Sequence, residues 1–466
     1  MKFIIAATKP VYDESSQEIT GVDRFQYFYD NMTSELWDSQ GNEIAVTPIR
    51  IQGKYKEFPA TSVNTPNTKN TIIKTLKIQL GLSCNYSCEY CSQRFVPNIE
   101  HSNTKLLDKF VNSLDNWLLY TPDTIEFWGG EPFVYWKNFK PLAETLRDRF
   151  PFTNFLVITN GSLLTEEIVE WLDRLDFTVG VSHDGPGQNV RGPNPFDDPK
   201  SRDLILKLFE RLLPKKKISI NSMIHRENLD RAAIQEYFES IFGAQRLFAI
   251  GEGAFVDVYD EGGMKNTLQS HAEHLAFRRL SLESIDAGTC NRFIIAHKRI
   301  EDWINSWGNK RPAYSLGQKC GMDDPHTISV DLMGNVITCQ NVTVSARAPN
   351  GKSHRIGHVD NFDDIKLNTA THWKFRDECS KCPLLQVCRG SCMFLEGEYF
   401  KKSCDTAYSD NLPFFAKAFE QVTGALPYAI QAIEDDYKLP DERSNLWGSM
   451  SDEVYVPQTR QEPFQG

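Results

Sequence analysis

The sequence predicts an α/β protein in which helices cover a parallel sheet, either a doubly wound sheet or a partial barrel. Short β-branched runs between residues 75 and 260 alternate with helical patterns. One helical pattern, from Leu106 to Leu118, repeats apolar residues at a spacing of about 3.6 residues. Such alternation is typical of parallel sheets, whose sites lie at the carboxyl ends of the strands. The predicted strands are Leu76–Leu82, Thr124–Trp128, Asn154–Thr159, Phe177–Ser182, Lys217–Met223 and Arg246–Val258.

Composition and charge narrow the classes of function. The chain has 466 residues, of which 40% are hydrophobic and 24% are charged, which is enough apolar material for a packed core. Its net charge of −11 does not provide the basic surface that nucleic-acid binding requires. No apolar run reaches the ~20 residues of a membrane span, and the five apolar residues from Phe3 to Ala7 are too few for a secretory signal. We therefore expect a cytoplasmic protein without nucleic-acid or membrane partners.

Changes of pattern along the chain predict five segments. Short extended stretches surround a turn signal at Asp38–Asn42, and the polar run Thr61–Asn70 is typical of a linker. Amphipathic stripes follow the α/β part, and seven cysteines come after them. The predicted segments are a small β-rich unit (1–72), the α/β core (73–260), a helical bridge (261–319), a cysteine-rich domain (320–410) and a C-terminal extension with a short helix at Phe414–Val422 (411–466).

The chain has eleven cysteines, which is an odd number. Close spacing without an export signal favours metal or cluster ligation over a disulfide framework. Cys84, Cys88 and Cys91 lie in the loop directly after the first predicted strand. Three thiolates at this spacing can hold three irons of a four-iron cluster and leave the fourth iron open. A zinc site with three cysteines, or incidental packing, is the alternative.

This loop, with Tyr90 before its last cysteine, resembles the CxxxCxxC signature of the radical S-adenosylmethionine (radical SAM) superfamily. The stretch Phe127–Pro132 matches the GGEP motif of the same family. The resemblance implies a partial (β/α)6 barrel, a 4Fe–4S cluster on the three cysteines, and S-adenosylmethionine on the open iron as the source of a 5′-deoxyadenosyl radical. It implies that the cofactor-binding residues are Tyr90, Gly129, Gly130, Glu131, Pro132, Asn160, Ser182, Arg191 and Asn221.

The resemblance also implies roles for these residues. Two glycines let backbone carbonyls approach the cofactor's ammonium group, and Glu131 adds negative charge. Asn160 and Ser182 offer amide and hydroxyl groups to the ribose and carboxylate, and Arg191 pairs with the carboxylate. His183 is either a proton donor or a packed imidazole, and the second interpretation is favoured.

The second group of cysteines resembles the SPASM domain of radical SAM enzymes, which binds two auxiliary 4Fe–4S clusters, although a single CxxC would equally suit zinc. The resemblance divides the ligands into two sets. The outer set is Cys379, Cys382, Cys388 and Cys404, and the inner set is Cys320, Cys339 and Cys392.

The inner set is one ligand short. Either His326 or an Asp completes it, or the fourth position stays open for a substrate atom. Sulfatase maturases carry an Asp after the second inner cysteine, where this chain has Gln340, and a carboxamide cannot accept a proton. We therefore do not expect formylglycine formation. Cys290 fits neither set and is predicted to be a buried free thiol.

The predicted function is oxidative crosslinking of a ribosomally made peptide, with a flavodoxin- or ferredoxin-like electron donor. This substrate class is implied by the resemblance, which also implies that residues 1–72 recognise a peptide, although a structural cap on the barrel is the favoured interpretation of this unit. The alternative is radical modification of a residue in a folded protein or of a small metabolite. A non-enzymatic electron carrier is the third interpretation, but a carrier does not need the complete set of methionine-binding loops.

Overall fold

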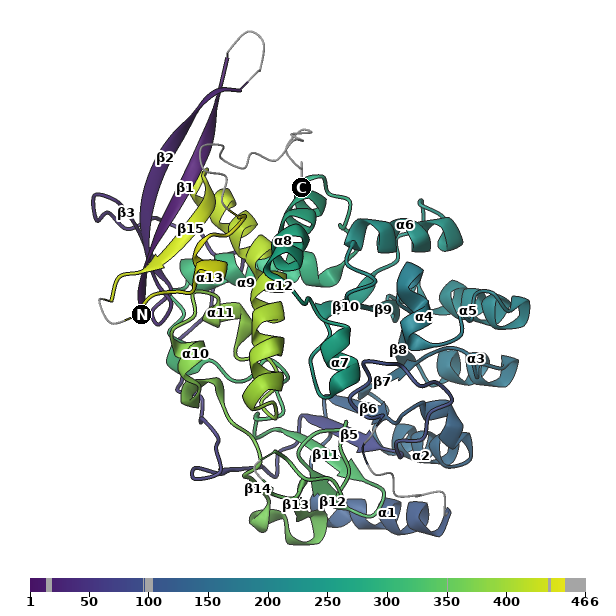
Figure 1. The fold of residues 1–466 in the computed structure, drawn as a ribbon. Helices are drawn as coiled ribbons and strands as arrows, with labels where there is room; N and C mark the ends of the chain where they lie inside the picture. Colours follow the sequence, from purple (N-terminus) through teal and green to yellow (C-terminus); the bar gives the residue numbers. More distant parts are fainter. Residues whose placement is uncertain (14–18, 95, 97–103, 350, 435–436, 449–466) are drawn as a thin grey trace.

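The computed structural model describes residues 1–13, 19–94, 96, 104–349, 351–434 and 437–448 (Figure 1). Its largest sheet contains six parallel strands that follow one another in chain order, so the predicted partial barrel is confirmed. These strands are β5 (Thr75–Gln79), β6 (Thr124–Trp128), β7 (Asn154–Thr159), β8 (Phe177–Ser182), β9 (Ile218–Ile224) and β10 (Ile250–Phe255).

Helices cover the outer face of these strands, and three of them begin where the sequence supplies a side-chain cap. Thr165, Asp198 and Asp230 accept hydrogen bonds from the first turns of their helices, satisfying N–H groups that lack a partner within the helix. The apolar faces of the helices pack with the strands in one continuous core. The covering helices are α1 (Thr104–Trp117), α2 (Trp136–Arg149), α3 (Glu166–Arg174), α5 (Pro199–Leu212) and α6 (Arg231–Phe242), with the short α4 (Gln188–Arg191) between β8 and α5.

The cysteine-rich part adds strands to the same sheet. The strand β11 (Thr327–Asp331) pairs in parallel with β5, and β12 (Asn335–Ile337) and β13 (Arg355–His358) continue the sheet in antiparallel pairs. The sheet order is therefore β10-β9-β8-β7-β6-β5-β11-β12-β13. The run predicted as a linker is not free, because β4 (Asn67–Thr68) pairs with β14 (Lys366–Leu367).

A second sheet joins strands from both ends of the sequence. Its order is β15-β1-β2-β3, built from β1 (Lys2–Tyr12), β2 (Ile19–Asp30), β3 (Glu35–Asp38) and β15 (Leu426–Ala432). Figure 1 shows this sheet at one end of the molecule, with the β1–β2 hairpin pointing away from the body. The strand-rich character predicted for the first 72 residues is present, but the pairing with β15 is not a feature that the sequence pattern revealed.

Three helices connect the barrel to the cysteine-rich part, and one long helix runs beside them. They are α7 (Glu261–Lys265), α8 (His271–Asp286), α9 (Ile294–Gly308) and α12 (Gly397–Thr423). The predicted short helix at Phe414–Val422 is only the last part of α12, which continues through Pro413 and begins before Cys404. Two further short helices, α10 (Asp377–Ser380) and α11 (Leu385–Cys388), carry cysteines, and α13 (Asp441–Ser444) follows β15. None of the described helices is both long and apolar enough to cross a bilayer.

A buried ion cluster joins α12 to the barrel. Asp410 on α12 pairs with Arg231 of α6 and with Arg299 of α9, whose nitrogen lies 2.9 Å from the carboxylate. All three side chains are buried. Burial alone raises the pKa of Asp410, but the two guanidinium groups outweigh it and hold the pKa well below its ordinary value.

The Asp410→Asn substitution is expected to destabilise the fold by about 3–5 kcal/mol, because it leaves two guanidinium groups buried without their counter-ion. The measurement is the free energy of unfolding in denaturant at neutral pH. Since the folded-state pKa of Asp410 is lowered, its contribution is present above the unfolded pKa of about 3.9 and is lost as the pH falls below it. The matched control is Asp115→Asn, whose side chain is 78% exposed and pairs with Arg149 at the surface. Equal losses of unfolding free energy in the two variants would contradict the conclusion that the buried ion cluster of Asp410 stabilises the fold more than a surface ion pair does.

Candidate active site

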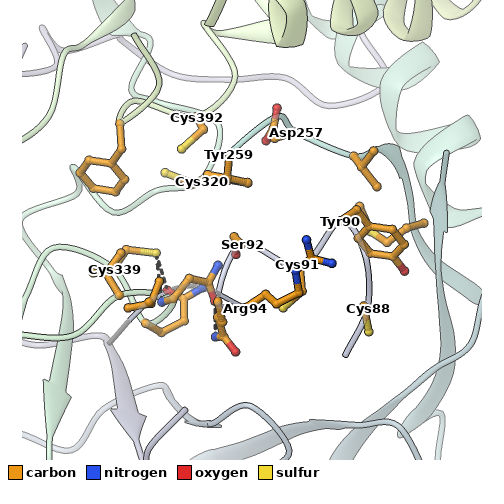
Figure 2. Close-up of a pocket in the computed structure, with 18 of the residues that line it drawn as sticks. Cys88, Tyr90, Cys91, Ser92, Arg94, Asp257, Tyr259, Cys320, Cys339 and Cys392 are labelled. Carbon is orange, nitrogen blue, oxygen red and sulfur yellow. Dashed lines mark hydrogen bonds between the residues drawn. The ribbon is translucent and has the colours of Figure 1, made fainter. Parts of the chain in front are cut away.

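A cavity of about 1300 Å³ opens inside the barrel at the carboxyl ends of its strands. Cys84, Cys88 and Cys91 line it from the loop after β5, and Cys320, Cys339 and Cys392 line it from the cysteine-rich part. Figure 2 shows Cys88 and Cys91 on one side of this cavity and Cys320, Cys339 and Cys392 on the other. The structure therefore brings together two groups of cysteines that are more than 200 residues apart in the sequence.

The cysteine loop is held in place by the backbone of the turn after β6. The amide of Gly130 donates to the carbonyl of Gly81 at 3.1 Å, and the amide of Glu131 donates to the carbonyl of Ser83 at 3.0 Å. A Cβ atom on Gly130 would lie 2.4 Å from the carbonyl oxygen of Leu82, so a side chain at this position is excluded. Gly130 thus makes room for the cysteine loop, and the approach of both glycines to the cofactor stays a prediction.

Glu131 connects the ends of two neighbouring strands. Its carboxylate accepts hydrogen bonds from the Thr159 hydroxyl at 2.7 Å, from the Asn160 amide at 2.8 Å and from the Phe133 amide at 3.2 Å. Burial raises the pKa of Glu131 to about 7, against the effect of these three donors. The side chain thus fixes the end of β6 to the end of β7 while it lines the cavity.

Tyr90 and Arg191 meet at a buried carboxylate. Asp184, directly after β8, accepts hydrogen bonds from the Tyr90 hydroxyl, from Arg191 at 3.0 Å and from the Met223 amide at 2.9 Å. Burial opposes ionisation of Asp184, but Arg191 holds its pKa below the ordinary value. The Nε atom of Arg191 is buried and has no partner among the described residues. The cysteine loop is therefore tied to the ends of β8 and β9 as well as to β6.

The remaining predicted cofactor-binding residues lie along the strand ends. Asn160 donates to the side chain of Asn85 in the cysteine loop at 2.9 Å, and Ser182 is the register partner of Asn221 in the neighbouring strand. Gly180 leaves the space that the Asn221 side chain occupies, because a Cβ there would lie 2.3 Å from its amide nitrogen. All predicted cofactor-binding residues line the cavity except Pro132, which begins the 3₁₀ helix η1 (Pro132–Tyr135).

His183 is a packed imidazole, as the favoured interpretation predicted. Its ring is fully buried against Phe196, Tyr237 and Phe238, and its Nε2 atom bonds to the side chain of Asn194 at 2.8 Å. Burial lowers the pKa of His183 to about 4, so the ring is neutral near pH 7. His183 is absent from the cavity wall.

The inner cysteines have neighbours that the sequence analysis did not single out. Tyr259 and Asp257, in the chain after β10, line the cavity beside Cys392. The Tyr259 hydroxyl donates to the Cys392 sulfur, and Asp257 accepts a hydrogen bond from Ser391 at 2.6 Å. In contrast, the predicted ligand candidate His326 faces away, since its Nδ1 atom bonds to a backbone carbonyl at Ile72.

The other candidates for a fourth inner ligand, Asp323 and Asp324, also do not line the cavity. Asp323 accepts a hydrogen bond from the backbone of Gln318, and Asp324 accepts one from the backbone of His326. Gln340 lines the cavity next to Cys339, and Gln79 of β5 donates to its backbone carbonyl at 2.6 Å.

The outer cysteines surround a separate small cavity of about 20 Å³, which Cys379, Cys382, Cys388 and Cys404 line together. The backbone after Cys388 separates the two groups. Arg389, Gly390 and Ser391 adopt φ values of 51°, 78° and 53°, a left-handed run that non-glycine residues rarely form. This turn leaves Cys388 at the small cavity and places Cys392, four residues later, at the large one.

The cysteines that line the two cavities are arranged in a way that fits iron–sulfur clusters better than a single metal ion. All eleven cysteines are described, and none forms a disulfide. Among the described residues, no three His, Cys, Asp or Glu side chains lie close enough to hold one metal ion. A cubane needs wider spacing, since each thiolate binds a different iron. Burial raises the pKa of Cys88 to about 12, so its thiol is protonated near neutral pH unless a bound cation stabilises the thiolate.

Cys290 is buried, as predicted, and burial raises its pKa to about 11. It lines neither cavity. This thiol therefore packs in the core of the barrel rather than with the other cysteines.

An ion pair inside the barrel is the main feature that sequence reasoning missed. Lys77 of β5 and Glu126 of β6 are register partners, and their charged groups lie 3.2 Å apart in the cavity wall. The Trp128 indole donates to the same Glu126 carboxylate at 2.7 Å, and Lys77 lies over the Trp128 ring. The signal that points to this pair is a charged residue in the middle of each of two neighbouring strands, between apolar residues that are buried.

Comparison with known proteins agrees with this geometry. The family model of the radical SAM superfamily matches residues 78–237. The radical SAM cyclopropyl synthase TigE of Paramaledivibacter caminithermalis is 22% identical over 388 residues, which cover 76% of this chain and 74% of TigE. The serine-type anaerobic sulfatase-maturating enzyme of Bacteroides thetaiotaomicron is 32% identical over 117 residues, or 23% of this chain and 28% of that enzyme.

A solved structure of anSMEcpe with bound AdoMet and the Cp18Cys peptide shares the fold. The TM-score is 0.51 at 19% identity, and the match covers 75% of this chain and 98% of that chain. In this fold, the cysteine loop and the Gly129–Glu131 turn lie at the ends of the strands, within the region that matches the superfamily. Residues 78–237 are therefore a radical SAM region, and the chain is similar to a radical SAM enzyme over most of its length.

Proposed function

We propose that this enzyme oxidatively crosslinks a ribosomally made peptide. The observation that carries the proposal is the shared cavity, in which the cysteines of the radical-type loop face Cys320, Cys339 and Cys392 across one space. A radical formed on a substrate in this space lies beside a group that can take up an electron. The similarity to TigE and the fold shared with anSMEcpe, solved with a peptide bound, support the substrate class.

As a radical SAM enzyme, the protein uses S-adenosylmethionine and a 4Fe–4S cluster. In our proposal Cys84, Cys88 and Cys91 hold this cluster, and the outer and inner cysteine sets hold two auxiliary clusters. When bound, these groups supply the 5′-deoxyadenosyl radical that removes a hydrogen atom and an acceptor for the electron that the coupling releases.

The protein itself orients the cofactor. Asp184 fixes Tyr90 and Arg191, and Arg191 lines the cavity, where its guanidinium can pair with the carboxylate of the cofactor. Asn160, Ser182 and Asn221 present amide and hydroxyl groups from three successive strand ends. Because the strands and the Glu131 hydrogen bonds fix these groups, little side-chain entropy is lost when the cofactor binds.

An oxidative crosslink also releases a proton, and a carboxylate that lines the cavity can accept it. Gln340 cannot do so, and Glu131 is occupied by three donors. Glu126 faces the cavity from the strand that carries the Gly129–Glu131 turn, and Asp257 is hydrogen-bonded to the neighbour of Cys392. We infer that Glu126 accepts the substrate proton, with Lys77 and Trp128 holding its orientation.

The second candidate is modification of a folded protein or of a small metabolite with the same cofactors. The cavity is large enough for the cofactor together with part of a substrate, and its volume does not separate these classes. A low-potential donor of the flavodoxin or ferredoxin type is the reductant that we propose for either reaction.

Co-expression with short reading frames encoded beside the gene tests the substrate class. Under anaerobic conditions, one peptide is expected to lose the mass of two hydrogens, because a crosslink replaces two bonds to hydrogen with one new bond. Mass spectrometry of each peptide measures this loss. If 5′-deoxyadenosine is formed and no peptide changes mass, the second candidate replaces the first.

Anaerobically reconstituted enzyme is expected to contain about twelve irons, from three four-iron clusters. The Cys88→Ala variant should contain about eight and form no 5′-deoxyadenosine, while the spectroscopic signals of the auxiliary clusters remain. Iron analysis and product chromatography measure both quantities. About four irons in the unmodified chain, or continued cleavage by the variant, would refute the ligand assignment.

The Glu126→Gln substitution should reduce peptide modification about a hundredfold and leave 5′-deoxyadenosine formation within about twofold, because a carboxamide keeps the shape but cannot accept the proton. The measurement is the ratio of modified peptide to 5′-deoxyadenosine. Glu396→Gln, at an exposed position of the same cavity, is the control and should leave the ratio unchanged. An unchanged ratio in Glu126→Gln, or an equal loss of both products, would exclude this role.

A further inference from the structure

The outer cysteine site lies where the N-terminal and C-terminal parts of the chain meet. Asn31, directly after β2, is fully buried, and its side-chain amide donates to the backbone carbonyls of Ser380 and Cys382 at 3.0 and 2.8 Å. The side chain of Gln386 donates to the Asn31 carbonyl at 2.8 Å. The loop that carries Cys379 and Cys382 is therefore held from outside by the N-terminal sheet.

A charged side chain approaches the same site from the C-terminal side. The Arg443 guanidinium of α13 donates to the Cys404 sulfur at 3.3 Å and to the Asp405 carboxylate at 2.7 Å. Its guanidinium lies over the Tyr408 ring, 5.1 Å from the ring centre. The Arg443 side chain is 14% exposed, so solvent only partly screens its charge.

Contacts to the backbone fix the position of Arg443. The Tyr408 hydroxyl donates to the Arg443 carbonyl at 2.7 Å, and Arg279 of α8 donates to the carbonyl of Trp447 at 2.8 Å. The Trp447 indole donates to the carbonyl of Pro427 in β15 at 2.8 Å. The segment that carries Arg443 is thus anchored through its main chain and Trp447, and these contacts do not depend on the guanidinium group.

The charges around this contact do not cancel. Asp405 carries one negative charge, and Arg443 and Lys401 each pair with it, which leaves one positive charge next to Cys404. A hydrogen bond and a fixed positive charge at a ligating sulfur stabilise the reduced, more negative state of an iron–sulfur cluster. Cys404 belongs to the outer set, so this charge acts on the outer cluster of the proposed function.

We propose that Arg443 sets the reduction potential of the outer auxiliary cluster through its contact with the Cys404 sulfur. It is a positioning residue that raises the potential and so makes the outer cluster the favourable destination for the electron released by the substrate. The inference rests on the proposed function, because it requires a cluster on Cys379, Cys382, Cys388 and Cys404.

The test uses a Cys88→Ala, Cys339→Ala background, in which the outer cysteines are the one complete set. In this background Arg443→Gln is expected to lower the ratio of reduced to oxidised cluster about tenfold at a fixed applied potential. For a one-electron couple this is a shift of about 59 mV to more negative potential. Electron paramagnetic resonance during a potentiometric titration measures the shift, and iron analysis shows whether the cluster is retained.

Two further variants distinguish the effect of the contact between Arg443 and the Cys404 sulfur from the effect of any nearby positive charge. Lys401→Gln removes one positive charge from the same group but does not touch a cysteine, and it should shift the ratio much less than Arg443→Gln. Arg443→Lys keeps the charge and should restore part of the shift. If the Arg443→Gln variant does not retain its iron, its potential cannot be measured. The role of Arg443 is then tested by comparing the potentials of the Arg443→Lys and Lys401→Gln variants.

Each remaining outcome overturns a defined statement. An unchanged potential in Arg443→Gln, with about four irons present, overturns the role of Arg443 and leaves the proposed function intact. An equal shift in Lys401→Gln overturns the role of the sulfur contact. If the Cys88→Ala, Cys339→Ala protein holds no cluster, both this inference and the assignment of the outer ligands are wrong.

Discussion

The active-site geometry depends on the close approach of two backbone segments. The carbonyl oxygens of Leu82 and Ser83 pass so near Gly130 that no side chain can stand there, and amides of the same turn donate back to Gly81 and Ser83. This contact fixes the cysteine loop against the second strand of the barrel. The other ties of the loop, from Tyr90 to Asp184 and from Asn85 to Asn160, extend the same arrangement to the next strand ends. The thiols are therefore positioned before any cofactor binds.

Sharing a sheet places the inner cysteines opposite this loop. Because β11 pairs with β5, the chain between Cys320 and Cys339 continues the sheet that carries the cysteine loop. Gln79 of β5 donates to the carbonyl groups of Gln340 and Val342, which fixes the segment after Cys339 to the barrel. The segments that carry Cys320 and Cys339 are thus held by the same sheet as the cysteine loop.

Local patterns were enough to predict the barrel strands, because strands depend on neighbouring residues, whereas the division of the later cysteines into two sets came from the resemblance to the SPASM domain. The bounds of β6, β7 and β8 match the predicted strands, since β-branched runs between turns define them. Long-range pairing is different. Nothing local in β15 shows that it pairs with β1, and nothing in Phe414–Val422 shows that its helix starts before Cys404. Likewise, the space for Asn221 beside Gly180 exists only after the strands have paired.

This chain has Gln340 where sulfatase maturases carry an Asp, and a different carboxylate, that of Glu126, faces the cavity from the barrel wall. A peptide crosslink needs a proton acceptor near the reacting carbon, and an amide at this position cannot provide one. Lys77 and Glu126 form a largely buried ion pair, which costs desolvation energy that an apolar pair at the same register would avoid. An arrangement that is costly for stability and faces the cofactor cavity is best explained by the reaction. In the proposed function, the barrel wall rather than the segment after Cys339 would supply the base, and the electron would leave on the opposite side of the cavity.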